Sequence, residues 1–127
     1  MANFKELLVW QKSIDFVTEM YRITETFPQT EIYGLISQIR RVAVSIPSNI
    51  AEGNSRRSKP DYLQFLKISR GSCAEVETQL IISKNLKFLN ENESFGKRYF
   101  WRNTLHKPIH INFRLQKRKQ TFLYKSC

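Results

Sequence analysis

The chain has 127 residues, of which 41% are hydrophobic and 25% charged, with only four glycines and four prolines. This length suits one domain, and the composition excludes collagen-like, low-complexity and wholly disordered proteins. The formal net charge is +10, but residues 1–93 carry 12 Lys and Arg against 11 Asp and Glu, whereas residues 94–127 carry nine Lys and Arg and no acid. We therefore expect a near-neutral domain followed by a basic tail.

The first helix is predicted over residues 4–27. One apolar stripe recurs at steps of three and four residues, and a second stripe runs beside it. The first stripe consists of Trp10, Ile14, Val17 and Tyr21, and the second of Val9, Phe16, Met20, Ile23 and Phe27. Two stripes are wider than one partner helix needs, so this helix is expected to touch two neighbours, within its own bundle or across subunits. The second stripe is the predicted oligomer interface.

Two further helices are predicted over residues 31–52 and 59–89. Gly53 fits the position just after the end of the second helix. Ser58 is a cap for the third helix, followed by Pro60 in its first turn. The small side chains between Ser69 and Ala74 are expected to let another helix approach closely. Residues 1–93 are thus predicted to form one helical bundle domain.

The segment 94–127 does not continue this pattern. Gly96 and Pro108 interrupt it, and seven aromatic residues accompany its nine cations. We expect a short helix at most, near Phe95–Leu105, and extended or disordered chain after Pro108. A regular fourth helix is therefore not expected.

Four stretches carry a resemblance to a known family, and they are Phe4–Lys12, Tyr33–Arg41, Ser45–Gly53 and Gly71–Leu80. Through them, residues 4–89 resemble the four-helix bundle proteins encoded in intervening sequences of bacterial 23S ribosomal RNA genes. The resemblance implies an all-α, up-and-down four-helix bundle that assembles as a ring-like homo-oligomer, typically a pentamer. A relative in diversity-generating retroelements is a basic accessory protein that binds nucleic acid and the element's reverse transcriptase, so a reverse transcriptase is a partner only by distant analogy.

The resemblance ends after Glu93, where the family continues with an amphipathic, acid-containing fourth helix. We interpret the abrupt change in residue usage as the product of a frameshift, ahead of the alternative of a selected basic tail. Either origin removes the family's fourth helix.

Basic side chains suggest a phosphate-binding surface where the second and third helices meet, because the planar guanidinium of Arg binds two phosphate oxygens at once. The predicted nucleic-acid-binding residues are Arg40, Arg41, Arg56, Arg57, Lys59, Lys67 and Arg70. The alternative is a solvated or salt-bridged surface, since Glu52, Asp61, Glu75 and Glu77 lie nearby in sequence. Assembly into a ring would favour binding, because it repeats weak contacts.

Enzymatic, metal and cofactor functions find no support in the sequence. The polar residues Gln38, Asn49, Glu52, Glu75, Glu77 and Gln79 are expected to form interhelical or subunit hydrogen bonds, because no histidine lies in residues 1–93. His106 and His110 have the spacing of helical zinc ligands, but Pro108 lies between them. Cys73 is expected in the core.

The location is predicted from what the chain lacks. No apolar run approaches the roughly 18 residues of a membrane span, and no basic leader with an apolar stretch begins the chain. Two widely spaced cysteines suit a reducing compartment. We predict a cytoplasmic, non-enzymatic oligomeric module that binds RNA or DNA, or alternatively a scaffold that binds only protein.

Overall fold

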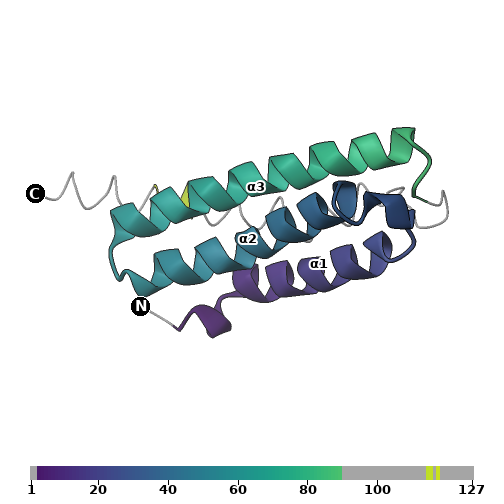
Figure 1. Ribbon diagram of the computed structural model, residues 1–127. Coiled ribbons are helices and arrows are strands. Elements are labelled where there is room, and N and C mark those ends of the chain that lie inside the picture. Colours follow the sequence, from purple (N-terminus) through teal and green to yellow (C-terminus); the bar gives the residue numbers. More distant parts are fainter. Residues whose placement is uncertain (1–2, 90–113, 116, 118–127) are drawn as a thin grey trace, which may run out of the picture.

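A computed structural model describes residues 3–89, 114, 115 and 117 of the chain. Its helices are α1 (Leu8–Thr24), α2 (Leu35–Ser55) and α3 (Lys59–Asn85), with single 3₁₀ turns η1 (Phe4–Glu6) and η2 (Gln29–Glu31). The three α-helices run up, down and up beside one another (Figure 1). The prediction of an all-helical fold is confirmed for these residues, which contain no strand.

The first helix begins four residues later than predicted. Asn3 does cap a helical turn, since its Oδ1 accepts a hydrogen bond from the backbone N–H of Lys5 over 3.0 Å, but this turn is η1. Leu7 then adopts an extended conformation (φ −72°, ψ 122°), and α1 starts at Leu8. One extended residue therefore divides the predicted helix 4–27 into two parts.

The second helix differs from its prediction at both ends. At its start, the Glu31 carboxylate accepts a hydrogen bond from the N–H of Leu35 over 3.1 Å, so α2 begins there and not at residue 31. At its far end, α2 continues to Ser55 and Gly53 lies inside it, buried. The prediction that Gly53 follows the helix is wrong, because this glycine provides space: a Cβ there would lie 2.6 Å from Cβ of Phe65.

The third helix begins as predicted and ends four residues early. Oγ of Ser58 accepts from the N–H of Asp61 over 3.5 Å, and Pro60 occupies the first turn. At the other end, Lys87 has a φ of 62°, and the N–H of Phe88 donates to the carbonyl of Ser83 over 2.9 Å. This is the Schellman arrangement, which closes a helix with a left-handed residue that is usually glycine.

The helix α2 is central, because both α1 and α3 pack against it. No Cα atom of α1 lies within 8 Å of a Cα atom of α3. Between α2 and α3, Oγ of Ser45 donates to Oγ of Ser72 over 2.8 Å, and Oγ of Ser69 donates to the carbonyl of Ile46 over 3.2 Å. The predicted close approach at Ser69–Ala74 is thus confirmed.

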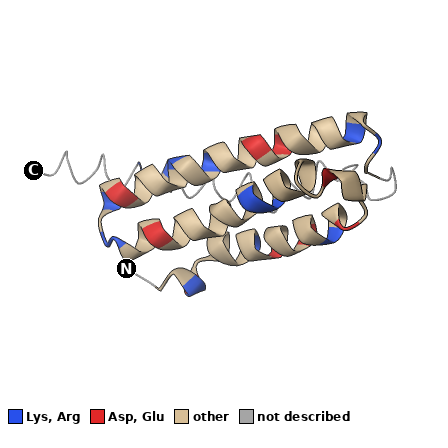
Figure 2. Ribbon diagram, viewed as in Figure 1, with Lys and Arg blue, Asp and Glu red and all other residues tan. Residues whose placement is uncertain are grey.

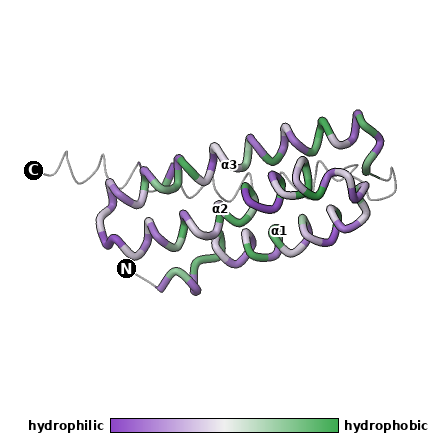
Figure 3. Tube along the Cα trace, in the orientation of Figure 1, coloured by the Kyte–Doolittle hydropathy of each residue, from purple (hydrophilic) through white to green (hydrophobic). Residues whose placement is uncertain are grey.

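Apolar side chains from all three helices form one buried cluster. Apolar and polar residues alternate along each helix of the trace, as a core with a polar exterior requires (Figure 3). The five residues predicted as an oligomer interface belong to this cluster: Val9, Phe16, Met20, Ile23 and Phe27 are each at most 4% exposed within the single chain.

These five side chains are thus buried within the single chain, and their role as an oligomer interface stays a prediction. The other stripe of α1 is the more exposed one: Ile14 and Tyr21 retain 38% and 42% of their accessible surface. Both stripes are apolar, so periodicity alone could not show which of them faces inward.

The predicted short helix near Phe95–Leu105 lies outside the described residues, as does a fourth helix of the bundle. The tail is described only at Arg114, Leu115 and Lys117, which have helical backbone. Extended or disordered chain was predicted after Pro108. This prediction is wrong at the three described residues.

Candidate nucleic-acid interface

The seven predicted nucleic-acid-binding residues do not form one surface. Arg40 and Arg41 lie in the first third of α2, whereas Arg56 and Arg57 follow its last residue. Sixteen residues of helix separate Arg40 from Arg56, which corresponds to about 24 Å along the axis. Charged segments in Figure 2 accordingly appear at separate places along α2 and α3. A short ligand could not contact both pairs together.

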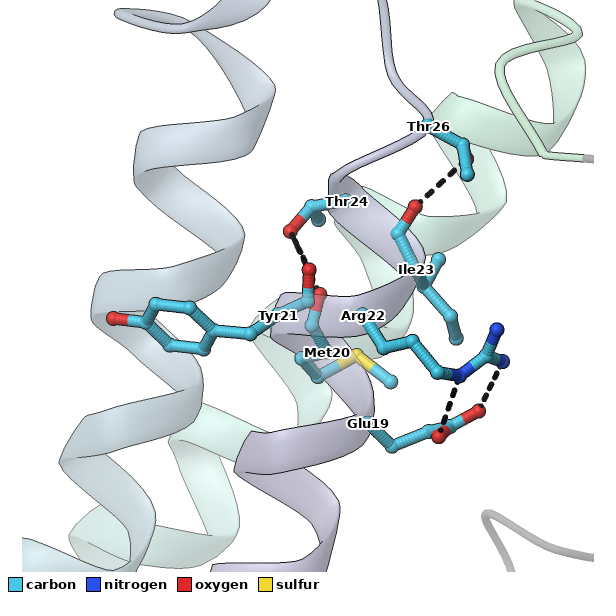
Figure 4. Close-up of polar contacts among 7 residues, drawn as sticks. All are labelled: Glu19, Met20, Tyr21, Arg22, Ile23, Thr24 and Thr26. Atoms are coloured by element: carbon cyan, nitrogen blue, oxygen red, sulfur yellow. Dashed lines mark hydrogen bonds and ion pairs between the residues drawn. The ribbon is translucent and has the colours of Figure 1, made fainter.

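Arg40 has a structural role between two helices. Its Nε donates a hydrogen bond to Oγ1 of Thr24 over 2.9 Å, and its guanidinium lies 4.6 Å from the ring centroid of Tyr21. Figure 4 shows the end of α1 that receives this side chain, where the Thr24 hydroxyl bonds back to the carbonyl of Met20. Arg40 thus joins α2 to α1, through Thr24 and through a terminal nitrogen that lies 3.4 Å from the carbonyl of Tyr21.

The exposed outer side of the same part of α1 carries a second paired cation. Arg22 and Glu19 form a two-pronged contact, with Nε and one terminal nitrogen of the guanidinium each bonded to a carboxylate oxygen (Figure 4). Both side chains are at least one third exposed. Such exposed pairs contribute little to stability.

The turn between α2 and α3 brings three cations together. Arg56, Arg57 and Lys59 lie within four positions, and the first two are exposed. Arg57 has a φ of 53°, which turns the chain from α2 toward α3. In the described part of the chain, neither Arg57 nor Lys59 has an acidic partner. We call these three residues the basic turn.

Two carboxylates reduce the positive charge of the basic turn. Glu52 accepts from a terminal nitrogen of Arg56 over 3.0 Å, and Asp61 lies in the first turn of α3. The Arg56 guanidinium also lies 5.6 Å from the ring centroid of Phe65. The Arg56 guanidinium is therefore already engaged with Glu52 and Phe65. Arg57 and Lys59 are the cations that a phosphate group would contact first.

Lys67 and Arg70 lie further along α3, away from the basic turn. At 100° per residue, Lys67 is about 140° around the helix from Ser72, which contacts α2. Lys67 is exposed and Arg70 is half-buried. The next charged residues of α3 are Glu75 and Glu77, so the basic part of α3 ends there (Figure 2).

The residues weighed for carboxylate chemistry mostly have structural partners. Nε2 of Gln79 donates to Oε1 of Gln38 over 3.5 Å, which is an interhelical contact as predicted. Nδ2 of Asn49 bonds to the carbonyl of Ser45 within α2 over 2.7 Å. Glu52 pairs with Arg56 as described above. The predicted interhelical bonding is therefore confirmed for Gln38 and Gln79, whereas Asn49 and Glu52 bond locally along α2.

Cys73 is buried in the core, as predicted, and 1% exposed. Burial raises the pKa of its thiol to about 12, because the low-dielectric interior disfavours the thiolate. The described residues contain no cluster of His, Cys, Asp or Glu that could hold a metal ion. His106 and His110 lie outside these residues.

One surface feature was not anticipated from the sequence. Ile68 and Ile82 on α3, and Leu86 directly after its last residue, are each 44–52% exposed. At 100° per residue they fall within about 40° of one another, so they form a row on one side of α3, in which Glu75 and Gln79 lie between Ile68 and Ile82. Ile68 and Ile82 are 14 residues apart and Ile82 and Leu86 are four apart. These helical spacings could have identified the row from the sequence.

The family described as 23S rRNA-intervening sequence protein matches residues 5–98 of the chain. The chain belongs to this family. The match covers α1, α2 and α3 and ends five residues beyond Glu93, so residues 99–127 lie outside it. The resemblance inferred from residues 4–89 is thereby confirmed. A comparison with curated proteins returned no match.

Among the described residues, no helix has both the length and the apolar composition that a membrane span requires.

Proposed function

We propose that this chain is a non-enzymatic, oligomeric helical-bundle module of the cytoplasm that binds RNA or DNA through the basic turn. The observation that carries the proposal is the position of two cations without acidic partners: Arg57, exposed in the turn beside Arg56, and Lys59, half-buried at the start of α3. Phosphate groups are the natural ligands of such a turn, because Arg and Lys contacts to phosphate supply most sequence-independent affinity.

The proposal narrows the predicted set of seven residues. Arg40 is excluded from the interface because it bonds to Thr24. Arg41, Lys67 and Arg70 are secondary contacts that a longer nucleic acid reaches after it has bound the basic turn. Each turn supplies few charges, so useful affinity requires several copies of the turn on one assembly.

The direct test is a triple substitution of the basic turn, Arg56→Ala, Arg57→Ala and Lys59→Ala, in the full chain. Binding of fluorescent single- and double-stranded RNA and DNA is measured by anisotropy at low salt. We expect affinity to fall about tenfold or more, because three counterion-releasing contacts are lost. The unfolding curve should change little, since no core residue is altered.

The matched control removes the same number of charges elsewhere. Lys5, Lys84 and Lys87 are exposed and lie outside the basic turn, so their replacement by Ala keeps the net charge equal to that of the triple variant. Equal losses for the two variants would mean that only net charge matters. Unchanged binding by the basic-turn variant would overturn the proposal for this surface.

A scaffold that binds only protein is the second candidate. The row of Ile68, Ile82 and Leu86 favours it, because exposed apolar side chains arranged along one side of a helix suit contact with another protein, including a second copy of this chain. The pentamer implied by the family resemblance would then use exposed residues and not the buried stripe of α1.

Light scattering after size-exclusion chromatography distinguishes the candidates when it is combined with the binding test. Replacement of Ile82 by Glu should reduce the oligomer mass if the row is a subunit contact, because it places a charge in that contact. An oligomer that binds none of the four nucleic-acid probes would leave only the scaffold. A chain that is monomeric at micromolar concentration would contradict the oligomeric part of both candidates.

A further inference from the structure

We draw no further inference here: the strongest candidate, the surface patch that the 94% exposed Tyr33 forms with Ile32 just before α2, carries nothing because nothing in the structure shows what covers it.

Discussion

Arg40 of α2 donates a hydrogen bond from Nε to Oγ1 of Thr24 in α1 over a distance of 2.9 Å. The Thr24 side chain is fully buried, and its hydroxyl in turn donates to the carbonyl of Met20 over 2.7 Å. Arg40, which the pattern of charges predicted to bind nucleic acid, thus connects two helices. Its loss should affect folding first.

Replacing Arg40 with Ala should lower the free energy of unfolding by about 1–2 kcal/mol, because it removes a charge-assisted hydrogen bond and the contact with the Tyr21 ring. Urea denaturation followed by circular dichroism measures this change. Arg40→Lys is the control: it keeps the charge and lacks the guanidinium donors, so it should recover only part of the loss. An Arg40→Ala protein of full stability and reduced nucleic-acid affinity would refute the structural role.

Two glycines allow a matched test of helix packing. Gly53→Ala should destabilise the protein by about 1–3 kcal/mol, because the added Cβ would lie 2.6 Å from Cβ of Phe65 and 3.2 Å from Cδ2 of Tyr62. Gly71→Ala should stabilise it by about 0.5–1 kcal/mol, since no atom lies within 4 Å of the added methyl and alanine favours helix. Thermal unfolding of both variants compares them, and effects of the same sign would contradict this packing.

Gly53 also shows where sequence reasoning reaches its limit. In the sequence, Gly53 follows a run of apolar residues at helical spacing, and a glycine at such a position usually marks the end of a helix. Only the neighbouring α3 reveals that Tyr62 and Phe65 approach this position, which requires a residue without a side chain. Helix existence was predictable from periodicity, whereas this boundary depended on tertiary packing.

Met20 provides a test of the predicted oligomer interface. Met20→Glu should destabilise the single chain by about 3–5 kcal/mol, because the side chain is 2% exposed and the charge would be buried without a partner. Ile82→Glu is the matched control at a site that is 44% exposed, and we expect it to change stability by about 0.5 kcal/mol or less. A Met20→Glu protein that keeps normal stability and merely dissociates would support the interface prediction and contradict this expectation.

The reactivity of Cys73 should follow its burial. In a Cys127→Ser background, a thiol reagent such as DTNB should modify Cys73 in the native protein only as fast as the protein opens, since the thiol is buried and its pKa is raised to about 12. Urea should make modification fast. Rapid reaction of the native protein near pH 8 would contradict the core position of this residue.

The same raised pKa predicts the direction of a pH effect. Between the ordinary thiol pKa of 9.0 and the folded value of about 12, the unfolded chain releases a proton from Cys73 that the folded chain retains. Stability should therefore fall as pH rises above about 9, by about 1.4 kcal/mol per pH unit from this group alone. Cys73→Ala lacks this thiol, so the difference in unfolding free energy between the two proteins should follow this slope.

The candidate site was predictable only in part. The basic residues of the connector after the second helix were expected to flank a loop, and Arg56, Arg57 and Lys59 do lie at the turn between α2 and α3. The remaining members were grouped because the second and third helices were expected to bring them to one surface. Helical geometry separates them, since Lys67 is rotated away from the side of α3 that contacts α2. Counting charges cannot reveal such rotation.

The salt dependence of RNA binding tests the central claim most directly. Affinity of the full chain for a single-stranded RNA is measured from 50 to 200 mM salt, and the slope of log K against log salt is compared with those of two variants. One lacks the cations of the basic turn, and the other carries Lys117→Ala, Arg118→Ala and Lys119→Ala in the tail. We predict that the basic-turn variant has a slope shallower by up to about 2, at roughly 0.7 per lost phosphate contact. A slope that stays the same in this variant and becomes shallower only in the tail variant would contradict the claim that the bundle itself binds nucleic acid.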